Sequence, residues 1–157
     1  MLVGAVPPIM VSTDEWPGGL DISVFDSIRK GVFDNRSNFY LELAIPFFGM
    51  NRPGATINEG LRQSFWAQGM MGSILGQYAC NHEFSEVDYT QDLRRVDVPA
   101  LVIHGDDDQI VPISHAGELT AQIVPGAQLR VYEGAPHGLA ATHEDKLNTD
   151  LLAFAQS

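Results

Sequence analysis

Basic residues are scarce in this sequence, which has 9 Lys and Arg against 20 Asp and Glu and a formal net charge of −11. A nucleic-acid-binding surface needs clustered Lys and Arg side chains to neutralise phosphates, and no such cluster is present. Binding to an anionic membrane is disfavoured for the same reason. We therefore expect neither a nucleic-acid nor a membrane partner.

Cysteine and long apolar runs are also nearly absent. Cys80 is the single cysteine, so no internal disulfide and no cysteine cluster for a metal can form. No stretch approaches the ~20 apolar residues of a membrane span, and the apolar opening lacks the basic start of a signal peptide. We expect a soluble, cytoplasmic protein with a single domain over residues 1–157, since 157 residues suit one domain.

The chain divides into three parts by its pattern. Residues 1–8 resemble a buried strand that Pro7 and Pro8 end, and a domain that begins inside its sheet suggests further structure upstream. Residues 9–90 are mostly helical in periodicity, which predicts a cap-like insertion. Residues 91–157 alternate strand, turn and helix. The expected fold class is α/β, with a short parallel sheet and a helical cap.

Local patterns place the individual elements. Continuous or alternating apolar residues predict strands over 2–6, 98–104 and 128–132. Helical spacing and capping residues predict one helix that begins after Asp21 and a second over 38–43 that ends before Pro46. A third helix is predicted after Asn58, and further helices over about 71–81, 114–123 and 142–154.

Two features carry chemistry. His104-Gly-Asp-Asp-Asp108 is an acidic turn at the end of a buried strand, and His137 lies in a tight loop after the next strand. The carboxyl ends of parallel strands are where open α/β sheets gather catalytic groups. Asp followed by His on consecutive strand ends is the late chain order of a Ser–Asp–His hydrolase, in which the carboxylate orients the histidine base. A metal site is not expected here, because the acidic run lacks the spacing of a calcium loop.

Six segments together resemble the cofactor-free, non-haem chloroperoxidase and arylesterase family of α/β-hydrolases. They are Val3-Gly-Ala-Val-Pro-Pro8, Phe47-Phe-Gly-Met-Asn-Arg-Pro-Gly54, Phe65-Trp-Ala-Gln-Gly-Met-Met71, Val102-Ile-His-Gly-Asp-Asp-Asp-Gln-Ile-Val-Pro112, Ala135-Pro-His-Gly138 and Leu151-Leu-Ala-Phe154. The resemblance implies that Asp108 is the catalytic acid and His137 the catalytic base, and that no cofactor is needed. It further implies the last three strands of the family's sheet, and an acyl pocket near Phe25, Phe84 and Ile110.

The nucleophile is the departure from that family. No serine lies in a G-x-S-x-G motif, and the family's oxyanion loop has no counterpart. Ser73, Ser85 and Ser114 are candidate replacements from the cap or flanking loops, and water activated by His137 is a further alternative. Cys80 is interpreted as a buried, inert helix cysteine.

Two functions are therefore open. The first is hydrolysis of small short-acyl carboxylic esters by His137 and Asp108. The second is a non-catalytic half, either complementing a split hydrolase or binding small apolar ligands. Without the family's other strands, sheet and helix surfaces would be exposed. We therefore expect a homo-oligomer, or association with a separately encoded N-terminal half.

Overall fold

The computed structural model describes residues 1–156, and a three-stranded parallel sheet forms its centre. Strands β1 (Leu2–Val3), β2 (Leu101–Gly105) and β3 (Gln128–Tyr132) lie in the order β1-β2-β3. All five residues of β2 are buried, as the continuous apolar run predicts for a central strand. The predicted parallel sheet is confirmed, but β1 is shorter than expected because Gly4 turns the chain with φ +54°.

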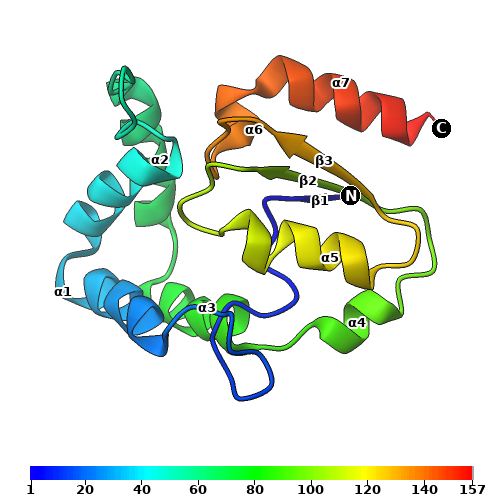
Figure 1. Ribbon diagram of the computed structural model, residues 1–157. Helices are drawn as coiled ribbons and strands as arrows, with labels where there is room; N and C mark the ends of the chain where they lie inside the picture. Colours follow the sequence, from blue (N-terminus) through cyan, green and yellow to red (C-terminus); the bar gives the residue numbers. More distant parts are fainter. Residues whose placement is uncertain (157) are drawn as a thin grey trace.

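Helices cover both faces of the sheet (Figure 1). On one face, α5 (Gly117–Ile123) and α4 (Thr90–Arg94) pack through Leu93, Ala100 and Val124. On the other, α6 (Leu139–Thr142) and α7 (Glu144–Ala155) cover a buried cluster of Leu101, Ile103, Tyr132, Leu139 and Leu147. The result is a three-layer α/β arrangement around a short sheet.

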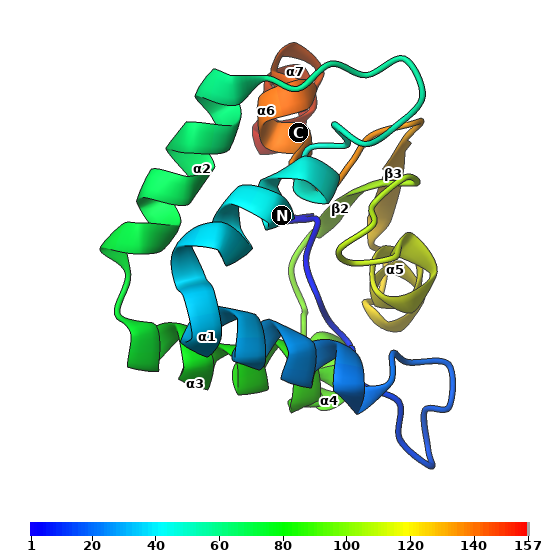
Figure 2. The same cartoon turned by 90° about the vertical axis from the view of Figure 1, so that its left-hand side faces the viewer.

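A separate group of helices forms the cap. Helices α1 (Ile22–Phe47), α2 (Glu59–Met71) and α3 (Ile74–Glu86) stand over the carboxyl ends of the strands (Figures 1 and 2). Asp21 caps α1 by accepting from the N–H of Ser23, and Asn58 caps α2 by accepting from that of Leu61. Both predicted caps are confirmed, and the catalytic loops lie between this group and the sheet.

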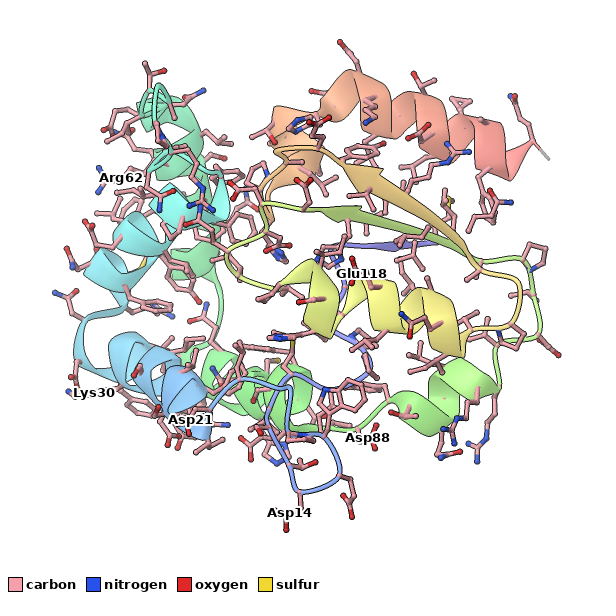
Figure 3. All side chains as sticks on the ribbon, in the orientation of Figure 1. Asp14, Asp21, Lys30, Arg62, Asp88 and Glu118 are labelled. Atoms are coloured by element: carbon pink, nitrogen blue, oxygen red, sulfur yellow. The ribbon has the colours of Figure 1, made fainter. Side chains whose placement is uncertain are left out.

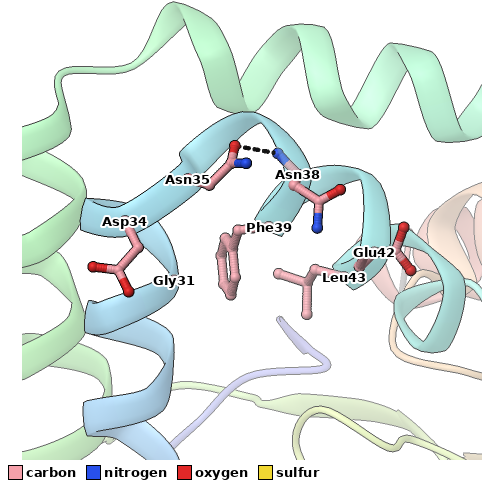
Figure 4. Close-up of a pocket in the computed structure, with 7 residues that line it drawn as sticks. All are labelled: Gly31, Asp34, Asn35, Asn38, Phe39, Glu42 and Leu43. Carbon is pink, nitrogen blue, oxygen red and sulfur yellow. Dashed lines mark hydrogen bonds between the residues drawn. The ribbon is translucent and has the colours of Figure 1, made fainter.

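Helix α1 consists of two helical segments that meet at a kink, as the prediction of two helices expected. At Asn35 (φ −157°, ψ 76°) the backbone is not helical, and the side chain of Asn35 accepts from the N–H of Asn38 and caps the second segment (Figure 4). A hollow of about 380 Å³ lies on this bend. Pro46 was expected to follow the helix but sits inside its last turn. Pro46 has no N–H and so removes one i→i−4 hydrogen bond from the helix. Because it lies in the last turn, only the end of α1 is affected.

Three further boundaries differ from expectation. The helix predicted over 71–81 begins at Ile74 instead, because the Ser73 hydroxyl accepts from the N–H of Gly76 and caps it there. The segment from 113 to 123 is a short 3₁₀ turn, η1 (Ile113–His115), followed by α5. The last predicted helix is divided into α6 and α7 at His143, whose ψ of 36° breaks the helix. None of the helices in residues 1–156 is both long enough and apolar enough to cross a membrane.

Candidate active site

Asp108 lies in the loop that follows β2, with its side chain fully buried. One carboxylate oxygen, Oδ1, accepts from the backbone N–H groups of Ile110 (2.9 Å) and Val111 (2.7 Å). The other oxygen, Oδ2, faces two histidine rings. A buried carboxylate needs such a complete set of donors, because an unpaired charge in the interior is costly.

His137 follows β3, and its ring meets Asp108 from the neighbouring loop. Nδ1 of His137 lies 2.7 Å from Oδ2 of Asp108. Because an ionised carboxylate only accepts, Nδ1 carries the proton in this bond and Nε2 keeps its lone pair. Among residues 1–156 no polar group bonds Nε2, and 19% of the side chain is exposed. The accessible nitrogen is thus the one that can take a proton from a bound molecule.

His104, the fourth residue of β2, completes the surroundings of Asp108. Its Nε2 lies 2.8 Å from the carbonyl oxygen of Val111 and 3.2 Å from Oδ2 of Asp108. Both neighbours are acceptors, so Nε2 carries the proton. Burial by itself would raise the pKa of Asp108, but the hydrogen bonds from His104, His137 and the N–H of Val111 outweigh it and hold that pKa well below its usual range.

The end of α1 holds the His137 loop in place. The ring of Phe47 meets that of His137 edge to face, with centroids 4.7 Å apart. The N–H of Gly138 donates to the carbonyl oxygen of Phe47 at 2.8 Å. A side chain at Gly138 would overlap the ring of Phe48, so only glycine fits this contact. The cap therefore positions the His137 ring as well as covering it.

The other two aspartates of the acidic turn have different partners. Oδ1 of Asp106 accepts from the N–H of Gly134 (2.6 Å), which ties the Asp108 loop to the turn after β3. Asp107 forms an ion pair with Arg52 of the cap. Among the described residues, no group of three or more His, Cys, Asp and Glu side chains converges as metal ligands.

An apolar cavity of about 300 Å³ is lined by residues of α1 and α3, of the segment before α1 and of the loop after β2. Phe25, Phe84 and Ile110, near which the resemblance implies an acyl pocket, all line it, whereas His137 does not. The rings of Phe25 and Phe84 meet edge to face, 6.1 Å apart. Phe47 also lines it, so the cavity reaches the residue that packs on the His137 ring.

The three candidate nucleophilic serines have places in the fold that do not involve His137. The Ser85 hydroxyl is fully buried and donates to the carbonyl oxygen of Asn81 (2.6 Å). Ser73 caps α3, and Ser114 lies exposed in η1. None of the three bonds the His137 ring. Cys80 is exposed, which corrects its interpretation as a buried cysteine. Most residues of α3 are exposed, and Cys80 also lines the apolar cavity.

Three features of this site were not predicted from the sequence. They are the second histidine contact on Asp108, the ring of Phe47 against His137, and the buried amide of Asn81 in the cavity wall. The spacing of His104 and Asp108 was a usable signal, because four residues across a strand end and a turn can bring two side chains together. The other two depend on packing between helices and left no local signal.

The parallel sheet, the cap and the Asp108–His137 pair together are the architecture of an α/β-hydrolase. The family model of the alpha/beta hydrolase fold matches residues 28–144. The chain belongs to this family, as its sequence motifs predicted.

Several relatives agree with this assignment. A non-heme haloperoxidase of Rhodococcus erythropolis is 51% identical over 158 residues, which cover 100% of this chain and 58% of that protein. A bifunctional esterase/perhydrolase DCH of Acinetobacter calcoaceticus is 44% identical over 158 residues, covering 100% and 57%. The crystal structure of a bromoperoxidase from Bacillus anthracis superposes with a TM-score of 0.93 at 33% identity, over 99% of this chain and 56% of that one. The chain thus spans a little over half the length of the relatives that it matches.

Proposed function

We propose that the chain takes part in hydrolysis of small carboxylic esters with short acyl groups. The observation that carries the proposal is the 2.7 Å contact of His137 Nδ1 with the buried Asp108, which leaves Nε2 accessible. Phe47, whose ring contacts that of His137, also lines the apolar cavity. An oriented imidazole with a free ring nitrogen is the arrangement that general-base catalysis requires. The relatives named as an esterase/perhydrolase and a haloperoxidase support the same class of reaction.

In this mechanism one proton moves first onto Nε2 of His137 and then from Nε2 to the leaving alcohol. Nε2 takes the proton of the attacking hydroxyl group as its oxygen bonds to the ester carbonyl carbon. The imidazolium that results is stabilised by the ionised Asp108, which keeps the Nδ1 proton between them. The tetrahedral intermediate then expels the alcohol, whose oxygen receives the proton from Nε2. Asp108 stays ionised throughout, in keeping with its lowered pKa.

The surroundings favour small, uncharged esters. The cavity of about 300 Å³ is lined mainly by aromatic and aliphatic side chains, which suits a short acyl or aryl group. The net charge of −11 repels anionic substrates before they reach it.

The attacking group is the open part of the proposal. Ser73, Ser85 and Ser114 have the structural roles given above, so water held by His137 and Asp108 is the nucleophile that we favour for the chain by itself. A serine presented to His137 by another chain is the alternative.

The test measures hydrolysis of 4-nitrophenyl acetate, butyrate and octanoate by the purified chain. Turnover that falls from butyrate to octanoate supports a short-acyl hydrolase with the cavity as its acyl site. Rates equal to those of buffer for all three esters contradict hydrolysis by this chain.

The second candidate is a non-catalytic half, which complements a split hydrolase or binds small apolar ligands. It is favoured by the length of the chain, which spans 57–58% of its relatives, and by the missing G-x-S-x-G motif. A fluorophosphonate probe labels an activated serine and spares an inert one, so it separates a serine-dependent hydrolase from the non-catalytic half. A water-dependent hydrolase is instead separated from the non-catalytic half by its turnover of the 4-nitrophenyl esters. Labelling of any serine in this chain rejects the non-catalytic function, whereas labelling only of an added partner chain supports complementation.

A further inference from the structure

The wall of the cavity contains one buried amide side chain without a hydrogen-bond partner among the described residues. Asn81 of α3 is 2% exposed, and neither Nδ2 nor Oδ1 of its amide has a hydrogen-bond partner among the described residues. Leaving a buried amide unpaired costs the desolvation free energy of each of its polar groups, because no new hydrogen bond compensates for the lost water. Such groups are rare in folded proteins and call for an explanation.

The neighbouring side-chain amide on α3 has its hydrogen-bond partners within the protein. Gln77, one turn earlier, also lines the cavity, but its Nε2 donates to the carbonyl oxygen of Gly69 (2.6 Å) and its Oε1 accepts from Arg36 (3.4 Å). The backbone carbonyl of Asn81 is likewise occupied by the Ser85 hydroxyl. Of the two amide side chains in the cavity wall, that of Asn81 is the one left to pair with a molecule inside the cavity.

The surroundings of this amide are apolar. The cavity wall near it is built from side chains such as Met10, Phe25 and Phe84. Burial raises the pKa of Tyr40, another lining residue, although Arg36 opposes the shift. A hydrogen bond formed in such an environment is stronger than the same bond in water.

We propose that Asn81 is a specificity residue that binds a hydroxyl group on the acyl chain of the substrate. A hydroxyl both donates and accepts, so a single group can pair Oδ1 and Nδ2 together. It is also small and neutral, whereas a carboxylate would enter a cavity that offers it no cation and would pay a large desolvation cost. The preferred substrates are thus esters of short hydroxy acids. This proposal deepens the proposed ester hydrolysis and rests on it for the identity of the ligand.

The test uses binding, so that it does not depend on turnover. The probes are the ketones 2-pentanone and 4-hydroxy-2-pentanone, each enantiomer separately, which mimic a butyryl and a 3-hydroxybutyryl group and cannot be hydrolysed. Their dissociation constants are measured by NMR titration of the ¹⁵N-labelled chain. The side-chain amide signals of Asn81 are assigned by their loss in Asn81→Leu, a substitution that keeps the number and branching of the side-chain heavy atoms.

We expect at least one enantiomer of the hydroxyketone to bind about 5- to 10-fold tighter than 2-pentanone, as one hydrogen bond predicts, and to shift the Asn81 amide signals. In Asn81→Leu the preference should disappear or reverse. Phe84→Leu is the control, because it reshapes the cavity while leaving the amide, and should change the affinities of both ketones together. Equal affinities in the wild-type chain, or a preference that survives in Asn81→Leu, overturn the role of Asn81. The ketone data are independent of ester turnover, so inactivity toward esters would contradict the proposed function alone.

Discussion

His104 and Asp108, four residues apart, meet through Nε2 and Oδ2 at 3.2 Å, with both side chains fully buried. The same carboxylate oxygen also receives His137 at 2.7 Å. Asp108 thus connects the buried His104 with the partly exposed ring of His137. The site depends on this carboxylate remaining ionised inside the protein.

The first prediction concerns acid stability. Because the pKa of Asp108 is lowered by folding, the ionised form stabilises the native state above the unfolded-state pKa of about 4. This contribution is lost as the pH falls from there toward the lower folded-state pKa. Chemical denaturation of the wild-type chain should therefore show a decline in unfolding free energy below about pH 4. Asp108→Asn should be less stable at neutral pH and should lose less of its stability on acidification.

Asp14→Asn is the control for that experiment. Asp14 lies at the tip of the exposed loop before α1, pointing away from the molecule (Figure 3). Its variant should follow the wild-type curve. Identical acid dependence of Asp108→Asn and the wild-type chain would contradict the proposed electrostatic role of Asp108.

The second prediction tests how closely the two catalytic loops approach. A Cβ at Gly105, the last residue of β2, would overlap the backbone carbonyl of Ala135, two residues before His137. Gly105→Ala should destabilise the fold by about 1–3 kcal/mol, since backbone has to move. Gly18→Ala, where a Cβ meets nothing within 4 Å, should change stability by less than about 0.5 kcal/mol. Urea denaturation of both variants measures the difference, and equal stabilities would show that the loops are not in tight contact.

The third prediction concerns association. The outer edge of β1 pairs with no other described strand, and Leu129 and Val131 of β3 are 36% and 45% exposed. Open sheet edges and apolar surface favour pairing with another chain. For the chain in isolation we predict self-association, measured by size-exclusion chromatography with light scattering. A stable monomer at micromolar concentration would contradict both the oligomer and the need for a separate first half.

The parts of the fold that the sequence predicted are those with local causes. The strand ends at Gly105 and Tyr132, and with them the positions of Asp108 and His137, follow from apolar runs that stop at turn residues. The caps at Asp21 and Asn58 depend on a side chain and a backbone group two or three residues apart. Such relationships are visible in a short window of sequence.

The parts that it did not predict depend on tertiary packing. The kink at Asn35 brings the ring of Phe39 onto Gly31, where a Cβ would lie 2.5 Å from that ring. The pattern predicted the two helical segments on either side of Asn35, but not this contact between them. Nothing in the sequence around Asn81 distinguished it from other polar residues of a helix. Its amide is buried where α3 packs against α1.

The central claim is that His137, oriented by Asp108, acts as the base in ester hydrolysis. Its most direct test compares 4-nitrophenyl butyrate hydrolysis by the wild-type chain, His137→Ala and His82→Ala, with circular dichroism to verify the fold. His82 is an exposed histidine on α3 and serves as the matched control. We predict that His137→Ala lowers kcat by about 10²- to 10⁴-fold and that His82→Ala retains the wild-type rate. Equal turnover by the wild-type chain and a folded His137→Ala would contradict the account.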